Sequence, residues 1–568
     1  MNKIQFKKYG YVFAVLMTSA FFRNAHAYPI QVLGQDEASM VPNISGPITK
    51  DGKNYDVIVI GAGLSGLSSA VYLTDNGLSV LMLEKAGNLG GLASGGTTAN
   101  GVRYDRGAAY WTITFPEEHW ILEHIYGKAF KKPDQIPEPA DSFLWKGVLY
   151  KGIWEEETLA KLPMSFTVFQ YELKKASKAG LIPNQPIEEA KDKRLDKISV
   201  TDWIRSMPIT LSRRKDSQSI SLYRKFLADS KVNRDDPMAD VIELSDLYCR
   251  SALGTTSDGV SAIAFGNFYI AEIIPRYTTP QGTAGPAEKM EDTLRTRGET
   301  LAKLLTLAPV GKVRNENDHV TVTYSKDGKV HEAVGKYAIY AAPVKFAPVI
   351  IDGLAAQDPA KADAINHLGY AHYSVHSVFL NGHPYRASYD TWTRPDNYTD
   401  DQFTDVILGR WMDPAMRGYL GYRDFEKDPT DNQGIMTIYH PLTEKWLGTG
   451  YTEPQAKQIA QAAVDKMVEL YTPLLRKGDH FDITRVETNR WPFSVHIAKP
   501  GHFSGTAQNP GIAQLLRRPF GHVYFANNNL GTPAFEEALF RGHCAADNIL
   551  RHLIPDYKVE NWTRCPLE

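Results

Sequence analysis

Three glycines and one acid near the start of the chain have the types and spacing to bind a dinucleotide. Gly61, Gly63 and Gly66 follow the apolar run YDVIVI and open a helical pattern over residues 64–76, and Glu84 ends the next apolar run. Glycine permits a tight turn and lets a pyrophosphate approach the backbone, while the helix N-terminus attracts the phosphates. An acid at this spacing can bind ribose hydroxyls. The pattern therefore predicts a nucleotide-binding βαβ unit.

The residues after Glu84 resemble those of a known family. The doublet Gly90-Gly91 is followed by NGVRYDRGAAYW, and both resemble the opening of the flavin-containing amine oxidases and their relatives, the carotenoid desaturases and protoporphyrinogen oxidases. The resemblance recurs at LLTLAPVGKVRNENDHVTVTYSKDG, at YAIYAAP and at RRPFGHVYFANNNLGTPAFEEALFRGHCAADNIL. It implies FAD as the cofactor, bound by three separate segments of the chain.

The fold that this resemblance implies is α/β. We expect a Rossmann-type, glutathione-reductase-like FAD-binding domain assembled from discontinuous segments, with an inserted mixed α+β substrate domain. The expected parts are a signal peptide over 1–27, an N-terminal arm over 28–54, FAD-binding segments over 55–130, 285–345 and 505–553, a helical part of the substrate domain over 131–284, its sheet-containing part over 346–504, and a C-terminal tail over 554–568. The periodicity also predicts a helix over 287–305.

The predicted cofactor-binding residues combine the glycine motif with the resemblance. They are Gly61, Ala62, Gly63, Ser65, Gly66, Glu84, Lys85, Gly90, Gly91, Leu92, Val310, Val313, Asn527 and Asn528. By the resemblance, Val310 or Val313 would contact the adenine end through backbone atoms. Relatives carry an acid on the flavin's ribityl chain where this chain has Asn527 and Asn528. An amide can also bond a ribityl hydroxyl, and the alternative is that the asparagines cap the final helix.

The resemblance also suggests residues at the reacting face of the flavin. Related amine oxidases place a lysine near flavin N5, and an alignment on Pro384 puts His376 there, where it could order a water or accept a proton. The alternative for His376 is a hydrogen-bonded core histidine. Phe503 and Phe535 are predicted walls of the substrate channel, whereas Trp491 is predicted as core. No cysteine lies near Phe503 in the sequence, so we expect FAD to be bound non-covalently.

Composition limits the other classes of function. The 568 residues are 43% hydrophobic and carry a net charge of −2, which argues against nucleic acid as the main partner. The three cysteines, Cys249, Cys544 and Cys565, form no C-x-x-C pair, and the chain contains no HExxH motif. We therefore expect no metal centre, while one disulfide is possible in an oxidising compartment.

The first 27 residues have the plan of a secretory signal peptide. Lys3, Lys7 and Lys8 precede the apolar run YVFAVLMTSAFF, and AHA provides a small-x-small cleavage site. The run is shorter than the ~20 residues that span a bilayer, although an uncleaved anchor is the alternative reading. We expect a mature chain that starts near Tyr28, is periplasmic or secreted, and has no stable membrane span.

Three functions remain open on these observations. The first is an exported FAD-dependent oxidoreductase that oxidises an amine, such as a polyamine or amino acid, by hydride transfer to flavin N5, with oxygen, a quinone or a cytochrome as electron acceptor. The second is an FAD-dependent desaturase or dehydrogenase of an apolar substrate, because NLGGLAS is closer to that branch. The third is a flavin-binding protein without catalysis.

Overall fold

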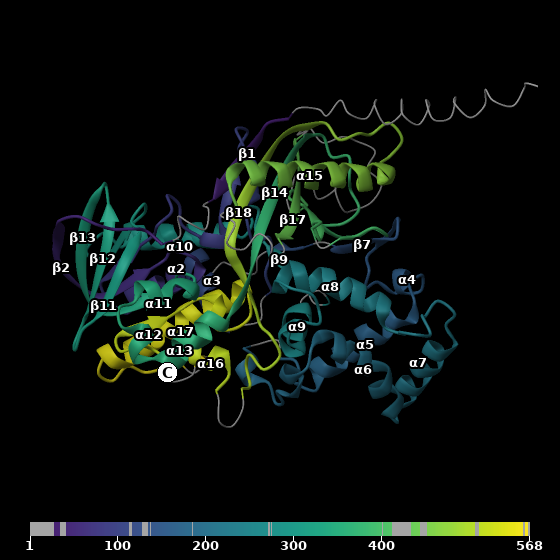
Figure 1. The fold of residues 1–568 in the computed structure, drawn as a ribbon, viewed down its shortest axis with the longest axis horizontal. Coiled ribbons are helices and arrows are strands. Elements are labelled where there is room, and N and C mark those ends of the chain that lie inside the picture. The colour runs from purple at the N-terminus through teal and green to yellow at the C-terminus, as the bar shows by residue number, and fades with distance from the viewer. Residues whose placement is uncertain are drawn as a thin grey trace, which may run out of the picture.

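Two β-sheets and a separate layer of helices organise the computed structural model of the chain. A seven-stranded sheet lies on the left of Figure 1, an eight-stranded sheet lies at its upper centre, and the helical layer lies at lower right. The structure describes residues 28–34, 41–112, 116–127, 134–136, 138–183, 186–270, 273, 275–399, 401–411, 433–442, 451–505, 510–560 and 563–565. The predicted signal peptide over 1–27 lies outside these residues.

The seven-stranded sheet is the nucleotide-binding sheet that the sequence predicts. Its strands, in spatial order, are β10 (Ala302–Leu305), β3 (Val80–Leu83), β2 (Ile48–Ile60), β13 (Lys329–Tyr340), β12 (Val320–Lys326) and β11 (Val310–Asn315), and β19 (Val523–Phe525) also pairs with β13. The strands β10, β3, β2, β13 and β19 pair in parallel, whereas β11, β12 and β13 form an antiparallel meander. Segments from three distant parts of the chain thus complete one Rossmann-type α/β sheet, as expected.

One face of this sheet is covered by a group of helices. They are α2 (Leu64–Asp75), α3 (Pro116–Tyr126), α10 (Ala284–Thr296) and α17 (Phe535–Leu553). Helix α2 carries small and apolar residues all round and is buried along nearly its whole length. Its contact with α17 depends on Gly542, because a Cβ there would lie 2.1 Å from the carbonyl oxygen of Ser65. The last segment of the chain is therefore packed directly on the first.

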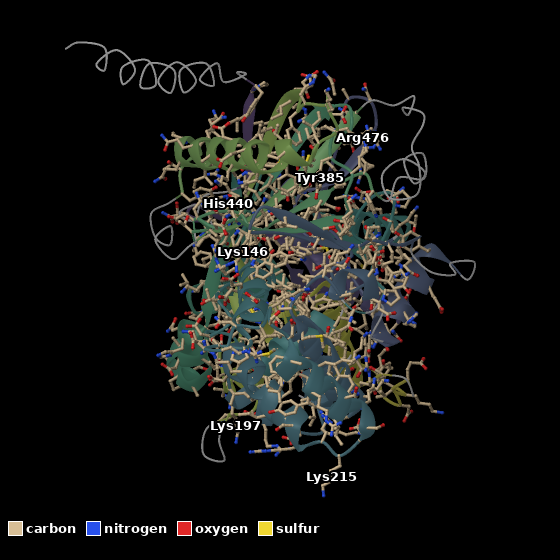
Figure 2. The ribbon with its side chains drawn as sticks, turned by 90° about the vertical axis from the view of Figure 1, so that its right-hand side faces the viewer. Lys146, Lys197, Lys215, Tyr385, His440 and Arg476 are labelled. Carbon is tan, nitrogen blue, oxygen red and sulfur yellow. A yellow bond between two sulfur atoms is a disulfide. The ribbon has the colours of Figure 1, made fainter. Side chains whose placement is uncertain are left out.

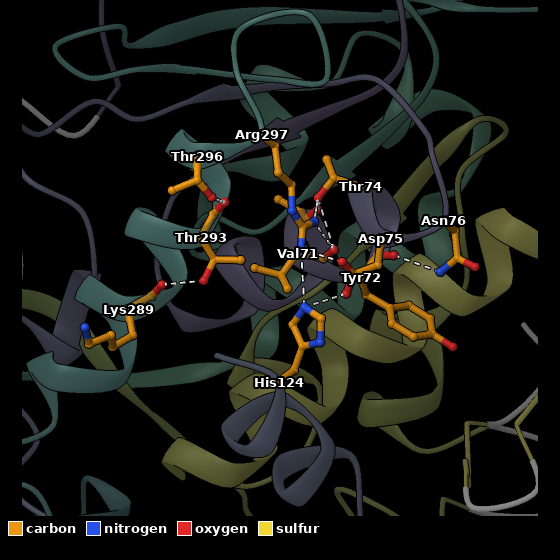
Figure 3. Close-up of polar contacts among 11 residues, drawn as sticks. Val71, Tyr72, Thr74, Asp75, Asn76, His124, Lys289, Thr293, Thr296 and Arg297 are labelled. Carbon is orange, nitrogen blue, oxygen red and sulfur yellow. Dashed lines mark hydrogen bonds and ion pairs between the residues drawn. The ribbon is translucent and has the colours of Figure 1, made fainter. Parts of the chain in front are cut away.

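The C-terminal end of α2 is held by Arg297, which follows α10. The Arg297 guanidinium donates to the Val71 carbonyl at 2.8 Å and also contacts Thr74 and Asp75, and His124 of α3 lies 2.9 Å from Asp75 (Figure 3). A cation at a helix C-terminus satisfies unpaired carbonyls and complements the helix dipole. The first and second segments of the nucleotide-binding domain are joined at this point.

The eight-stranded sheet is mostly antiparallel and contains the strands of the predicted substrate domain. Its order is β1 (Ile30–Gly34), β18 (Ile483–Ile497), β14 (Gly369–Asn381), β17 (Gln433–Leu442), β16 (Asp405–Leu408), β15 (Asp390–Arg394), β7 (Asp141–Trp145) and β8 (Val148–Lys151). Helix α15 (Glu453–Tyr471) packs along it in Figure 1. Two short ribbons pair β4 (Gly95–Thr97) with β5 (Arg103–Asp105) and β6 (Asp134–Gln135) with β9 (Tyr277–Thr278).

The helical layer lies on the opposite side of the eight-stranded sheet from α15 (Figure 1). Its helices are α4 (Glu156–Leu159), α5 (Met164–Lys178), α6 (Val200–Arg213), α7 (Ser217–Ala228), α8 (Ala239–Leu253) and α9 (Ala262–Tyr269). Buried aromatic side chains such as Phe166, Phe169 and Phe265 fill its core. In the described part of the chain, α11 (Ala347–Ile350), α12 (Leu354–Gln357), α13 (Pro359–His367) and α16 (Ile512–Arg517) lie near the nucleotide-binding sheet.

Two boundaries differ from the sequence-based expectation. The helix predicted over 287–305 is wrong at its end, because Gly298 adopts a φ of +74° after α10 and residues 302–305 form β10 beside β3. The apolar spacing of this segment fits a buried strand as well as a helix. The predicted arm over 28–54 is divided between the two sheets, since β1 pairs with β18 and β2 begins at Ile48.

The C-terminal tail is fastened to the nucleotide-binding domain. A disulfide joins Cys544 of α17 to Cys565, and Arg564 donates through its backbone and its guanidinium to the buried carboxylate of Glu117. Cys249 is a buried free thiol. Among the residues that the structure describes, no helix is both long and apolar enough to cross a membrane.

Candidate functional site

The glycine turn before α2 has space where a dinucleotide would lie. Gly61 has a φ of +98°, and Gly63 is the N-cap of α2. A Cβ on Gly66 would lie 2.0 Å from the carbonyl oxygen of Gly61, so Gly66 is required for packing. A Cβ on Gly63 would meet nothing within 4 Å. The open side of the turn therefore faces the helix N-terminus, as a pyrophosphate requires.

Glu84 connects the glycine turn to the second strand. Its two carboxylate oxygens accept hydrogen bonds from the backbone amides of Ala62 and Ala86, each at 2.7 Å. The backbone amide of Lys85 supports the same carboxylate. Burial raises the pKa of Glu84, and these amide hydrogen bonds oppose that rise. Because each carboxylate oxygen accepts more than one hydrogen bond, Glu84 can hold the turn and still bind ribose hydroxyls.

The glycine doublet lies against the same turn. Gly90 and Gly63 form a bridge of β type, and the Gly90 amide donates to the Ala62 carbonyl at 2.8 Å. Gly90 and Gly91 have φ values of +102° and +57°, and a Cβ on Gly91 would lie 3.3 Å from the Cα of Gly63. Leu92, which comes next, lines the cavity described below. The doublet thus leads the chain from the dinucleotide turn toward that cavity.

The structure distinguishes the two valines predicted at the adenine end. The Val313 carbonyl accepts a hydrogen bond from the Asp352 amide at 2.9 Å, so this backbone group is engaged within the fold. Val310 begins β11, two residues after Ala308, whose amide donates to the Glu84 carbonyl at 2.8 Å. Val310 is therefore the valine positioned near Glu84.

The asparagines after β19 have separate roles in the fold. Asn527 accepts from the Asn529 amide at 2.9 Å and donates to the Ala342 carbonyl at 2.8 Å, so it caps the short 3₁₀ helix Asn528–Leu530 rather than α17. Asn528 is partly exposed and makes one long contact with the side chain of Asn529, at 3.5 Å. Asn528 is thus the better placed of the two to bond a ribityl chain. Ser65, in the first turn of α2, is buried.

A cavity of about 190 Å³ lies where the two domains and the helical layer meet. Its wall includes Leu92 and residues 107–112 of the nucleotide-binding part, residues 533–536 at the start of α17, and side chains of α8, β14, β16, β17 and β18. Nine of its lining residues are aromatic: Tyr110, Trp111, Tyr248, Phe268, Tyr373, Trp392, Tyr439, Trp491 and Phe535. Pockets for drug-sized ligands hold roughly 300–1,000 Å³. The described cavity therefore suits a small substrate with an apolar body.

The charged groups of the cavity are all acidic. Its described lining contains the carboxyl groups of Asp390, Asp405 and Glu536 and no lysine, arginine or histidine. Glu536 accepts hydrogen bonds from the backbone amide and hydroxyl of Thr112, and burial raises its pKa. An acidic, aromatic cavity favours a cation over an anion as its occupant.

Asp405 is the carboxyl group best placed for proton chemistry. Its Oδ1 accepts from the hydroxyls of Ser251, at 2.8 Å, and Thr404, at 2.6 Å, and the Ser251 hydroxyl also contacts Tyr373 at 2.8 Å. Burial raises the pKa of Asp405 to about 7, against the effect of these hydrogen bonds. Asp405 can therefore take up or release a proton near neutral pH.

His376 does not reach the cavity. Tyr373 and Val375 of β14 line the cavity, and successive residues of a strand point to opposite faces, so His376 points away from it. Its Nδ1 lies 2.7 Å from the Thr488 hydroxyl and its Nε2 lies 3.4 Å from Nδ1 of His440. Burial, together with His440, holds the pKa of His376 well below its usual value. The geometry agrees with the alternative of a hydrogen-bonded core histidine.

The two predicted channel aromatics differ in position. Phe535 lines the cavity and stacks on Trp111 at a ring-centroid distance of 4.8 Å. Phe503 is buried in the core of the helical layer, away from the cavity lining, and its amide donates to Asp196 at 3.0 Å. Trp491, predicted as core, lines the cavity and donates to the Arg106 carbonyl at 2.7 Å.

Known proteins are similar to this chain in sequence and in fold. A sequence model of the family described as "Flavin containing amine oxidoreductase" matches residues 64–550. A carotenoid 3,4-desaturase of Haloarcula japonica is 34% identical over 102 residues, which are 15% of this chain and 20% of that protein. A flavin-containing amine oxidase of Danio rerio is 29% identical over 127 residues, 19% of this chain and 24% of that one. The chain thus spans about a fifth of the length of these relatives.

Solved structures match over much more of the chain. The cyclohexylamine oxidase from Brevibacterium oxydans IH-35A covers 88% of this chain and all of its own, with a TM-score of 0.58 at 17% identity. A fatty acid isomerase from P. acnes that produces CLA covers 89% of this chain and all of its own, with a TM-score of 0.58 at 14% identity. These likenesses show a shared fold.

Proposed function

The chain belongs to the flavin containing amine oxidoreductases, a family of FAD-dependent oxidoreductases, and from that premise we propose that it is an exported oxidase of small amines. The observation that carries this proposal is the acidic, aromatic cavity beside the dinucleotide turn. An amino acid or fatty acid substrate carries a carboxylate, and the described lining offers it no cationic partner. A monoamine or polyamine fits this lining better.

The chain's own residues have distinct roles in this proposal. The open side of Gly63 and the N-terminus of α2 would hold the pyrophosphate of FAD, Glu84 would bind a ribose, Val310 would contact the adenine and Asn528 the ribityl chain. When bound, FAD supplies the acceptor for a hydride from the substrate. Trp111, Phe535 and the other aromatic residues orient the apolar body of the amine and exclude water.

Asp405 gives the cavity a group that can prepare the amine for oxidation. An ammonium must lose its proton before the carbon beside it can give up a hydride, because the nitrogen lone pair stabilises the cation that forms. Asp405 has a pKa of about 7, so above that pH it is an ionised carboxylate that can accept the ammonium proton. We assign the proton to Oδ2 of Asp405, since Oδ1 accepts from Ser251 and Thr404.

The Cys544–Cys565 pair supports the proposal that the protein is exported from the cytoplasm. Cys544 and Cys565 form a disulfide that fastens the C-terminal tail, and such bonds persist mainly in oxidising compartments. The pair is independent of the signal-peptide pattern over 1–27. N-terminal sequencing of protein from a periplasmic or culture extract tests this location. We expect a start near Tyr28, and an intact Met1 in a cytoplasmic fraction would contradict it.

Anaerobic bleaching of the bound flavin tests the activity. Monoamines and diamines should bleach the visible spectrum, whereas amino acids and an apolar polyene should not. Bleaching by the polyene alone would establish the desaturase alternative, which the largely aromatic lining also accommodates. Bleaching by dithionite but by none of the substrates would leave a flavin-binding protein without this activity. Re-oxidation with oxygen, a quinone or a cytochrome then identifies the electron acceptor.

A further inference from the structure

A hairpin of two helices in the helical layer exposes apolar side chains that the proposed oxidase reaction does not use. Of the seven large hydrophobic side chains exposed in the described part of the chain, Ile209, Ile220 and Leu227 lie in α6 and α7. Their exposed fractions are 56%, 39% and 51%. Single exposed apolar residues are ordinary, but three within one hairpin need a reason.

The three side chains belong to one outward surface. In α7, the buried residues Ser219, Leu222 and Phe226 form the inner face. Ile220 and Leu227 lie on the opposite face, where Arg224 falls between them at the i, i+4, i+7 spacing. Helices α6 and α7 pack on each other and both pack on α5, so their outer faces point away from α5 together.

In α6, the helical periodicity of buried and exposed residues places Ile209 and Arg213 together on the outer face. Met207 and Leu211 are buried, whereas Ile209 and Arg213 are exposed and lie four residues apart. The connection to α7 adds Lys215, which projects from the lower edge of the molecule in Figure 2. The outer surface of the hairpin therefore combines aliphatic and cationic side chains.

The charge of this hairpin is opposite to that of the chain. Residues 209–227 contain five basic residues and one acid, whereas the whole chain carries a net charge of −2. Arg214 is paired with the Glu172 carboxylate at 2.6 Å, but Arg213, Lys215, Arg224 and Lys225 are exposed and form no ion pair among the described residues. A negatively charged surface would attract this face more strongly than the rest of the molecule.

We infer that the outer surface of α6 and α7, made by Ile209, Arg213, Lys215, Ile220, Arg224 and Leu227, binds an anionic lipid bilayer peripherally. The cations lie at the level of the headgroups, and the aliphatic side chains enter the boundary of the acyl chains. A hydrophilic polyanion would be attracted by the cations but would give the exposed aliphatic side chains no apolar contact. The combination of both side-chain types therefore favours a lipid surface.

Co-sedimentation with lipid vesicles tests this inference on the purified, FAD-loaded mature protein. Binding to vesicles rich in phosphatidylglycerol should be clear at low salt, weaker at high salt, and absent with pure phosphatidylcholine. Replacement of Arg213, Lys215 and Arg224 by alanine should weaken binding about a hundredfold. The matched control replaces the exposed Lys289, Lys329 and Lys477, which removes the same charge elsewhere and should change binding far less.

A second pair of variants separates a lipid surface from a hydrophilic polyanion. Ile220→Ser with Leu227→Ser should weaken vesicle binding about tenfold, whereas Val148→Ser with Val349→Ser, at exposed sites elsewhere, should not. Unchanged flavin content shows that each variant is folded. The inference is overturned if wild-type protein ignores the anionic vesicles, if the lysine control weakens binding equally, or if the aliphatic pair has no effect. In the last case heparin binding would identify a polyanion site.

Discussion

The dinucleotide turn and the cavity lie close together in the structure, but backbone atoms form the turn and side chains form the cavity. The turn is made by backbone atoms of a short continuous stretch, where Gly61, Gly63 and Gly66 leave no side chains in the way. The cavity is made by side chains from α8, α9, five strands of the eight-stranded sheet and two loops of the nucleotide-binding domain. Steric fit therefore controls the turn, whereas polarity and proton affinity control the cavity.

The turn should show the largest effect of a single substitution. Gly63→Val should abolish FAD retention, because its side chain would occupy the open space on the phosphate side. The fold should survive, since Gly63 has an ordinary φ of −72°. Flavin absorbance per protein and thermal unfolding monitor the two properties. Gly66→Val is the matched control and should reduce folded protein itself, because its Cβ would clash with Gly61.

The cavity should show its largest effect at Asp405. Asp405→Asn keeps the shape and the acceptor for Ser251 but removes the proton acceptor, so flavin reduction by amines should slow by about 10²- to 10⁴-fold. The measurement is stopped-flow bleaching under anaerobic conditions, with flavin content as the control. A variant that reduces its flavin at the wild-type rate would show that Asp405 moves no proton.

The two phenylalanines predicted for the channel should affect different properties: Phe535 should affect substrate binding, and Phe503 should affect folding stability. Phe535→Ala removes the stack on Trp111 in the cavity and should raise the KM for an amine roughly tenfold. Phe503→Ala should lower the free energy of unfolding by about 3–5 kcal/mol, because it opens the core of the helical layer, and should leave KM unchanged. Steady-state kinetics and denaturant unfolding test the pair. The reverse pattern would place Phe503 at the substrate.

His376 should have the smallest effect on the reaction. His376→Gln should leave flavin reduction within about twofold of wild type, because the side chain lies on the far face of β14. The lost hydrogen bond with Thr488 should lower the free energy of unfolding by about 1–3 kcal/mol. A proton acceptor at the flavin should cost roughly ten- to a thousand-fold in reduction rate when it is lost. A decrease of that size would show that His376 acts at the flavin after all.

The sequence predicted the dinucleotide turn well because the turn depends on local spacing. Gly61, Gly63, Gly66 and Glu84 lie within one βαβ unit, so the structure places them together as expected. The choice between Val310 and Val313 needed the structure, because it depends on which valine lies nearer to Glu84.

The cavity could not be predicted in the same way. Tyr248, Tyr373, Asp405 and Tyr439 are separated by long stretches of sequence. Pairing of the strands brings Tyr373, Asp405 and Tyr439 together, and packing of α8 on the sheet adds Tyr248. One signal was available for β14: the alternation of a strand places Tyr373 and Val375 on one face and His376 on the other, but it does not say which face borders the cavity. Trp111 lies within NGVRYDRGAAYW, one of the segments that carry the family resemblance, but the resemblance assigns no role to it.

The pH dependence of flavin reduction tests the central claim, that a carboxyl group in the cavity accepts the proton of an amine. Burial raises the pKa of Asp405 to about 7, so the group is neutral below that pH and ionised above it. The reduction rate at low amine concentration should therefore rise about tenfold per pH unit up to about pH 7 and then level off, apart from the ionisation of the amine itself. Asp405→Asn should lose this inflection and keep the one that belongs to the amine. An identical inflection near pH 7 in both proteins, or none in the wild type, would contradict the account.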